Sequence, residues 1–128
     1  MSRHILLVDD DSELLSLLVI YLAASGDGYE VETACSGKEA VSKMEVDSFD
    51  LVITDLYMPG MDGLALIQYV RQHSPNTPVI LMTSSRSSEI AADAYELGVY
   101  KKLNKPLSKK GFLSVVRQAL ESPELDGI

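Results

Sequence analysis

Polar residues that could do chemistry together stand directly after short apolar or strand-like runs. They are Asp9-Asp10-Asp11, Asp55, Thr83-Ser84-Ser85 and Lys105-Pro106. Carboxylates that lie close together repel each other, and a divalent cation resolves that repulsion. Oxygen ligands from few side chains suit Mg²⁺, which prefers to share its coordination shell with a phosphate. A lysine and a hydroxyl at the same place would bind phosphate oxygens. The residue types therefore indicate phosphoryl chemistry, with Asp55 as a candidate nucleophile that forms an aspartyl phosphate.

Each of these residues also has an ordinary structural interpretation. An aspartate after a strand often caps the next helix, and we expect this of Asp11 and Asp62. A single threonine such as Thr83 is usually a turn residue, and a single lysine such as Lys105 is usually solvated. The chemical interpretation therefore depends on whether the fold brings these residues together.

Strands and helices are predicted to alternate along the chain. The apolar runs 5–8, 51–54 and 79–82 fit strands that are buried on both faces of a parallel sheet. The more polar segments 29–34 and 99–103 fit edge strands, because their charges discourage further pairing. Helical spacing of apolar residues predicts helices over about 15–22, 37–44, 63–70, 87–97 and 112–119.

This alternation predicts an α/β fold in which a parallel sheet has helices on both faces. The order 2-1-3-4-5 places the three apolar strands at the centre and the two polar strands at the edges, with right-handed crossovers. Ligands of such sheets bind beyond the carboxyl ends of the strands, where the strand order reverses. That point lies between the first and third strands, where the polar residues converge.

Composition limits the class of protein. The 128 residues fit one domain, and 46% hydrophobic with 23% charged residues is ordinary for a folded protein. A net charge of -8 argues against gripping nucleic-acid phosphates, so we expect no direct nucleic-acid binding. The apolar runs are too short to cross a membrane, and the N-terminus lacks signal-peptide features. With a single cysteine, Cys35, these features predict a cytoplasmic location away from membranes.

The segments ILLVDDD, DLVITDLYMPGMDG, PVILMTSS and LNKPL occur in this order along the chain. Together they resemble the receiver domain of two-component response regulators, over essentially the whole sequence. The resemblance implies a (βα)5 flavodoxin-like receiver domain over residues 1–121, and we expect a flexible acidic tail over 122–128. It implies a signalling switch that is activated by phosphorylation.

The resemblance also implies a Mg²⁺ site and a phosphoacceptor. Asp55 matches the residue that accepts the phosphoryl group. Asp10 matches a direct Mg²⁺ ligand, and Asp9 acts mainly through water. The backbone carbonyl of Tyr57 matches the third protein ligand.

Further residues match the groups that bind the phosphate and respond to it. Thr83 would turn its hydroxyl toward the phosphate, Lys105 would pair with it, and the backbone N–H of Ser84 would reach it. The Lys105–Pro106 bond is expected to be cis. Family members usually carry an aromatic switch residue three positions before the lysine. Here that position is Lys102, so we expect Thr83 and Lys102 to form a switch that responds to charge.

The implied partners follow from this switch. A sensor histidine kinase or a histidine phosphotransfer protein would supply the phosphoryl group. The domain would transfer it to Asp55 and later hydrolyse it, and would have no other enzyme activity. The face formed by the fourth helix, the fifth strand and the fifth helix would then bind an output domain or protein, or a second copy in a phosphorylation-dependent homodimer.

Two other functions fit part of the pattern. A Mg²⁺-dependent phosphatase of the haloacid dehalogenase kind also uses an aspartyl nucleophile, but it normally needs a second aspartate two residues later, where this chain has Tyr57. A receiver-fold interaction module without phosphorylation would not need the full set of site residues. Incubation with a small acyl-phosphate donor and Mg²⁺ separates the three functions. A receiver gives a stable modification, a phosphatase gives turnover, and an interaction module gives no reaction.

Overall fold

The computed structural model describes residues 2–56, 58, 60–61, 63–84 and 97–121. Its strands are β1 (His4–Val8), β2 (Glu30–Ala34), β3 (Leu51–Asp55), β4 (Val79–Thr83) and β5 (Lys101–Asn104). Its helices are α1 (Ser12–Ala24), α2 (Gly37–Val46), α3 (Gly63–His73) and α5 (Lys109–Glu121). The predicted helix 87–97 falls almost wholly on residues 85–96, which lie outside the described residues, as do Asp62 and the predicted tail 122–128.

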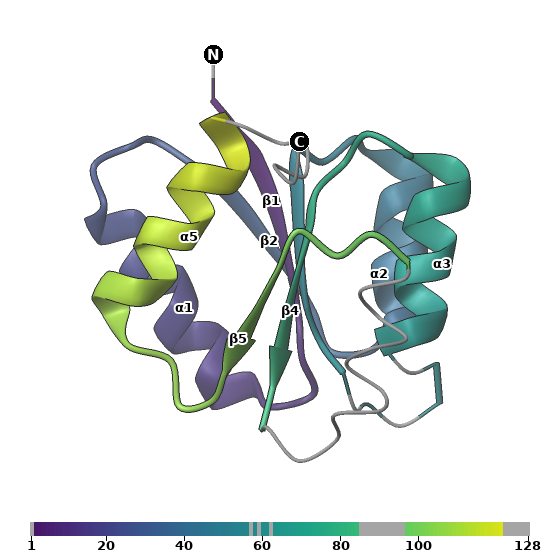
Figure 1. Ribbon diagram of the computed structural model, residues 1–128, viewed down its shortest axis with the longest axis horizontal. Helices are drawn as coiled ribbons and strands as arrows, with labels where there is room; N and C mark the ends of the chain where they lie inside the picture. Colours follow the sequence, from purple (N-terminus) through teal and green to yellow (C-terminus); the bar gives the residue numbers. More distant parts are fainter. Residues whose placement is uncertain (1, 57, 59, 62, 85–96, 122–128) are drawn as a thin grey trace.

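The sheet has the predicted order β2-β1-β3-β4-β5, and each neighbouring pair is parallel. The strand arrows that are visible in Figure 1 point toward the lower end of the view, so the carboxyl ends of the strands meet at one edge. The central strands β3 and β4 are buried throughout, whereas β2 and β5 are partly exposed. The expected division into apolar central strands and polar edges is therefore confirmed.

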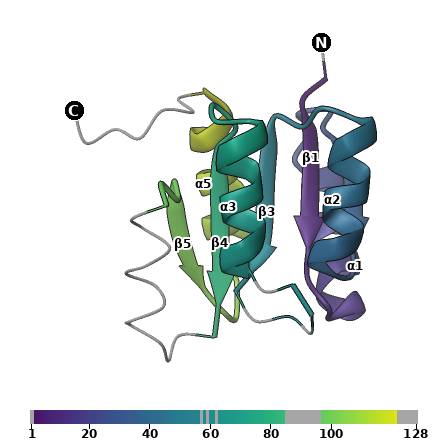
Figure 2. The same ribbon diagram turned by 90° about the vertical axis from the view of Figure 1, so that its right-hand side faces the viewer.

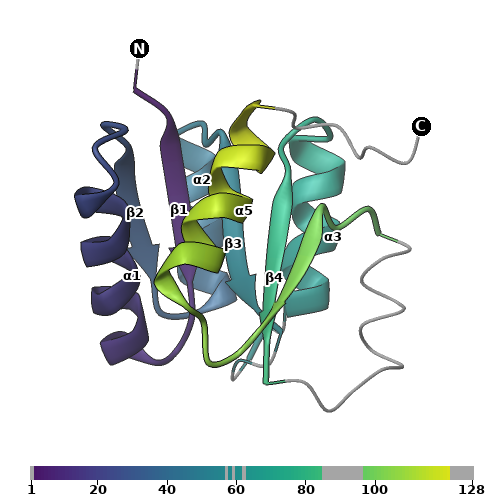
Figure 3. The ribbon, with the colours of Figure 1, turned by 60° about the vertical axis from the view of Figure 1, so that its left-hand side comes forward.

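Helices cover both faces of the sheet. Figure 2 shows α2 and α3 side by side over one face, and Figure 3 shows α1 and α5 over the other. Leu6, Val52 and Leu81 pack in the core cluster beneath α2 and α3. Ile5, Ile53 and Ile80 pack in the cluster beneath α1 and α5. Because successive strand residues enter opposite cores, both must be apolar, which explains the continuous apolar runs in the sequence.

Helix caps fix where the chain leaves β1 and β2. One carboxylate oxygen of Asp11 accepts hydrogen bonds from the backbone N–H groups of Glu13 and Leu14, at 3.1 and 3.2 Å. The hydroxyl of Ser36 accepts a hydrogen bond from the N–H of Glu39 at 3.1 Å. The N-cap that was predicted at Asp11 is confirmed, and the cap starts α1 immediately beyond the acidic pair.

The fifth strand differs from its predicted bounds. The prediction was 99–103, and the structure has Lys101–Asn104. Pairing with β4 nevertheless begins earlier, because the N–H of Tyr100 donates to the carbonyl of Val79 at 2.8 Å. It continues to Lys105, whose N–H donates to the carbonyl of Thr83 at 2.8 Å. The Lys105–Pro106 bond is cis, as the resemblance implies.

None of the helices in the described residues is long and apolar enough to cross a membrane.

Candidate functional site

Three carboxylates gather at the carboxyl edge of the sheet. Asp9 and Asp10 follow β1, and Asp55 is the last residue of the neighbouring strand β3. One ligand atom from each of the three lies within 4.8 Å of the others. Asp9 is fully buried and Asp55 is 7% exposed, whereas Asp10 is exposed. The cluster is therefore open to solvent on the side of Asp10 and closed on the side of Asp9.

Backbone N–H groups orient the two buried carboxylates. Oδ1 of Asp9 accepts a hydrogen bond from the N–H of Asp11 at 2.9 Å. Oδ1 of Asp55 accepts one from the N–H of Leu56 at 2.8 Å. These bonds fix one oxygen of each carboxylate, and the second oxygen of each faces the lysine that follows β5.

That lysine is Lys105, which bridges both buried acids. Its Nζ lies 2.8 Å from Oδ2 of Asp9 and 3.4 Å from Oδ2 of Asp55. The β5 strand carries it to the site, because the backbone of Lys105 continues the pairing with β4. A compact ammonium here neutralises part of the negative charge of the cluster.

Burial and neighbouring charges change the pKa values of Asp55 and Lys105. Burial raises the pKa of Asp55, and the charge of Asp9 raises it further, against the opposing effect of Lys105. Burial alone would lower the pKa of Lys105, but its hydrogen bond with Asp9 and the charges of Asp9 and Asp55 outweigh burial and raise it. The lysine therefore stays charged, and Asp55 is destabilised as an anion without a further cation.

The donor set fits a hard divalent cation. Three carboxylates offer oxygen ligands close together, and one of them, Asp10, is open to solvent. Mg²⁺ is bound by few carboxylates and keeps several waters, which matches an open cluster of this kind. Tyr57, whose carbonyl was the predicted third ligand, lies outside the described residues.

Thr83 and Ser84 lie next to this cluster along the sheet. Thr83 ends β4 and is 2% exposed, and the residue before it, Met82, is the register partner of Asp55. Ser84 follows directly and is exposed. The strand order therefore brings both predicted phosphate-binding residues to the edge that holds Asp55.

Lys102 lies apart from the carboxylate cluster. It is half-buried on β5 and is the register partner of Leu81, which belongs to the core beneath α2 and α3. Because side chains alternate along a strand, Lys102 occupies the α2–α3 side of the sheet. Asp55 is the register partner of Met82, which belongs to the core beneath α1 and α5, so Lys102 and Asp55 lie on opposite sides of the sheet.

The sequence did not single out two residues that contact the backbone of Asp55. The fully buried hydroxyl of Thr54 donates to the carbonyl of Asp55 at 2.9 Å. A Cβ atom at Gly63 would lie 2.4 Å from the same carbonyl oxygen. Thr54 could have been found from the sequence, because it is the one hydroxyl at the end of the apolar run 51–54. Nothing in the sequence indicates that Gly63 lies against the carbonyl of Asp55.

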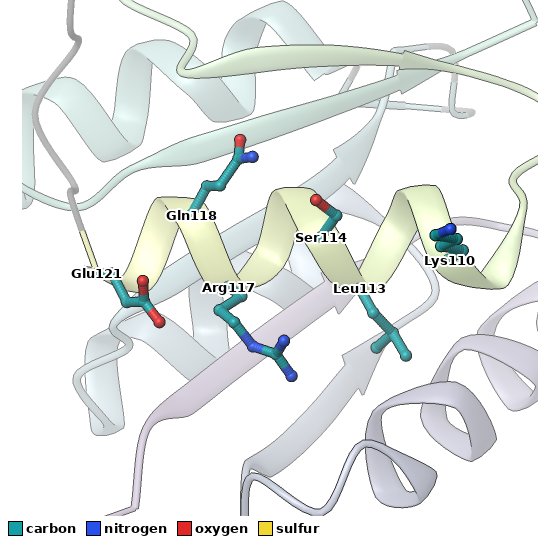
Figure 4. A pocket seen from close by; sticks show the side chains of 6 residues that line it. All are labelled: Lys110, Leu113, Ser114, Arg117, Gln118 and Glu121. Carbon is teal, nitrogen blue, oxygen red and sulfur yellow. The ribbon is translucent and has the colours of Figure 1, made fainter.

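A shallow hollow of about 480 Å³ runs along the outer face of α5. Figure 4 shows its lining side chains, which are Lys110, Leu113, Ser114, Arg117, Gln118 and Glu121. None of these residues belongs to the carboxylate cluster. The chemistry that the cluster could support therefore takes place at the edge of the sheet and not in this hollow.

Comparisons with known proteins agree with this arrangement. Residues 5–117 match the family described as the response regulator receiver domain. The transcriptional regulatory protein GlrR of Escherichia coli (strain K12) is 41% identical over 118 residues, which are 92% of this chain and 26% of that protein. The DNA-binding transcriptional regulator NtrC of Klebsiella pneumoniae is 35% identical over 114 residues, which are 89% of this chain and 24% of that protein. The chain thus spans about a quarter of the length of these curated relatives.

Solved structures give the same result for the fold. A CheY-like response regulator receiver domain protein from Methanospirillum hungatei JF-1 aligns with a TM-score of 0.89 at 28% identity, over 94% of this chain and 95% of that chain. NtrX from Brucella abortus, in complex with ADP, aligns with a TM-score of 0.87 at 29% identity, over 95% of this chain and 28% of that chain.

Proposed function

We propose that Asp55 accepts a phosphoryl group, since this chain belongs to the family of response regulator receiver domains. The chain is a phosphorylation-activated signalling switch of that family. One observation supports Asp55 above the other acids: its carboxylate ends a central strand and faces both the buried Asp9 and the ammonium of Lys105. The other acids of the cluster lack this combination.

The proposed reaction is a transfer between two nucleophiles. A carboxylate oxygen of Asp55 forms a bond to phosphorus, the bond from phosphorus to the donor nitrogen of a phosphohistidine breaks, and that nitrogen keeps the electron pair. The protein mainly positions groups and neutralises charge in such a step. Lys105, already within 3.4 Å of Asp55, would bind a phosphoryl oxygen, and the hydroxyl of Thr83 and the N–H of Ser84 would bind others.

The carboxylates of Asp9, Asp10 and Asp55, with the carbonyl of Tyr57, would hold Mg²⁺. When bound, Mg²⁺ supplies positive charge that offsets the incoming phosphate. Asp9 would act mainly through water, because Lys105 already occupies one of its oxygens. The exposed Asp10 would bind the ion directly.

The partners form part of the same proposal. The relatives are longer regulatory proteins, which favours a histidine kinase or histidine phosphotransfer protein as donor and an output domain as recipient of the signal. Output would pass through the face of the predicted helix 87–97, β5 and α5, of which residues 85–96 lie outside the described residues. A phosphorylation-dependent homodimer on this face, a cytoplasmic location and the lack of other enzyme activity remain predictions.

Incubation with acetyl phosphate and Mg²⁺, followed by intact-mass measurement, tests the proposal. The wild type and an Asp47→Asn control should gain one phosphoryl group, because Asp47 is exposed and lies outside the cluster. Asp55→Asn should gain none. Labelling that persists in Asp55→Asn would contradict the assignment of Asp55. Rapid release of inorganic phosphate with steady turnover would favour the phosphatase. No labelling of the wild type would favour the interaction module.

A further inference from the structure

Hydrogen bonds hold both ends of the loop between β3 and α3 close to Asp55. At its start, the N–H of Leu56 donates to the side chain of Asp55 at 2.8 Å and to the carbonyl of Met82 at 3.1 Å. At its end, the N–H of Gly63 donates to the carbonyl of Leu56 at 2.8 Å. The helix start at Gly63 therefore lies directly against the residue that follows the candidate phosphoacceptor.

The same loop rests on the first residue of α2. A Cβ atom at Gly37 would lie 2.9 Å from Cβ, from Cγ and from the backbone oxygen of Met61. A side-chain tip could rotate away from such an atom, but a backbone oxygen moves only with the loop. Gly37 is buried, and Met58 and Met61 pack into the core beneath α2 and α3, so the loop lies between two packed surfaces.

The backbone conformation of Gly37 does not require glycine. Its φ lies outside the left-handed region, in contrast to Gly60 at +83°. Glycine loses more conformational freedom on folding than any other residue, so a glycine that its backbone conformation does not require needs another physical reason. The close approach of Met61 gives a physical reason for the glycine.

We propose that Gly37 is a positioning residue for the metal site: the absence of a side chain there lets the N-terminus of α2 support the β3–α3 loop in the geometry that binds Mg²⁺. This inference rests on the proposed function. A side chain at position 37 displaces the backbone of Met61, which lies two residues before Gly63. Because the surroundings are close-packed, this displacement is transmitted to neighbouring residues and is not absorbed locally. Both ends of the loop are bonded beside Asp55, so the displacement reaches the ligands.

Titration with Mg²⁺ alone, followed by calorimetry, tests this role in Gly37→Ala. We expect the dissociation constant for Mg²⁺ to rise about tenfold or more, as for other residues that support metal ligands. Gly111→Ala is the matched control, because it adds the same methyl group in the first turn of α5, where it meets only the rotatable hydroxyl of Ser108. This control should bind Mg²⁺ as the wild type does. Urea unfolding in EDTA measures any loss of metal-free stability separately.

The outcomes separate this inference from the proposed function. A wild type that does not bind Mg²⁺ contradicts the proposed metal site. If the wild type binds Mg²⁺ and Gly37→Ala binds it with the same affinity, the role of Gly37 is overturned and the proposed metal site stands. If Gly37→Ala does not fold, Met61→Ala replaces it, since it removes the side chain that Gly37 supports. We then expect a several-fold weaker affinity, and an unchanged affinity overturns the inference.

Discussion

Nζ of Lys105 lies 2.8 Å from Oδ2 of Asp9, whose side chain is fully buried. Without a metal ion, this ammonium is the cation that the described residues bring to the buried carboxylate. The same ammonium is the proposed ligand of the phosphoryl group on Asp55. Phosphorylation would therefore draw Lys105 away from Asp9, and bound Mg²⁺ would take over part of the neutralisation of Asp9.

Replacing Lys105 should make the folded state depend on the metal. We expect Lys105→Met to lower the metal-free free energy of unfolding by about 1–3 kcal/mol, because the buried carboxylate of Asp9 loses its charged partner. Saturating Mg²⁺ should restore more stability to this variant than it adds to the wild type. Urea unfolding in EDTA and in Mg²⁺ measures both values, with Lys101→Met on the exposed edge as control. An equal loss with and without Mg²⁺ would show that the lysine has only a packing role.

Asp55 should destabilise the metal-free fold at neutral pH. Its pKa is raised in the folded state, first by burial and then by the charge of Asp9, so the folded state holds this proton more tightly than the unfolded state does. The stabilisation from this proton is therefore complete below the ordinary aspartate pKa, and it is lost as the pH rises through the folded-state pKa. Asp55→Asn, measured by urea unfolding in EDTA, should be more stable than the wild type at pH 7, and the difference should shrink toward pH 4. A difference that is constant with pH would contradict this account.

Asp10 should affect metal binding more than stability. It is the exposed carboxylate of the cluster, and its removal relieves repulsion without breaking an ion pair found in the described residues. Asp10→Ala should weaken Mg²⁺ binding and slow phosphorylation by acetyl phosphate together, while the metal-free melting temperature stays the same or rises. Calorimetric titration and thermal unfolding measure the two effects. A fall of several degrees in the metal-free melting temperature would mean that Asp10 is structural.

The position of the site could be predicted from the sequence because parallel strands end at one edge. Asp9 and Asp55 follow apolar runs that could only be central strands, and the order of those strands makes the two residues neighbours. Lys105 follows the edge strand and reaches the same end. The sequence does not show that Nζ of Lys105 lies closer to Asp9 than to Asp55. The two distances, 2.8 and 3.4 Å, differ by less than an ångström, and such a difference depends on the side-chain geometry of the folded site.

Other features depend on contacts between residues distant in sequence. Gly37 looks like an ordinary first residue of a helix, and only the fold shows that it abuts Met61. The predicted start of β5 was Val99, because Val99 and Tyr100 have side chains that are common in strands. The regular strand begins only at Lys101, and Val99 is buried in the core beneath α2 and α3.

Lys102 should make the response to phosphorylation depend on charge. It is half-buried on the α2–α3 side of β5, where its stem can follow apolar surface while its ammonium stays near water or an acid. A phosphoryl group on Asp55 carries roughly one and a half to two negative charges, about one more than the ionised carboxylate that it replaces, and charges at a protein surface interact over about a Debye length, roughly 8–10 Å. Lys102→Met keeps the length but not the charge, so it should lose most of the phosphate-dependent change in hydrogen exchange over residues 97–104. Lys102→Tyr tests whether an aromatic ring can replace the charge, and Lys101→Met should behave as the wild type. If Lys102→Met keeps the full change, the switch does not depend on the charge of Lys102.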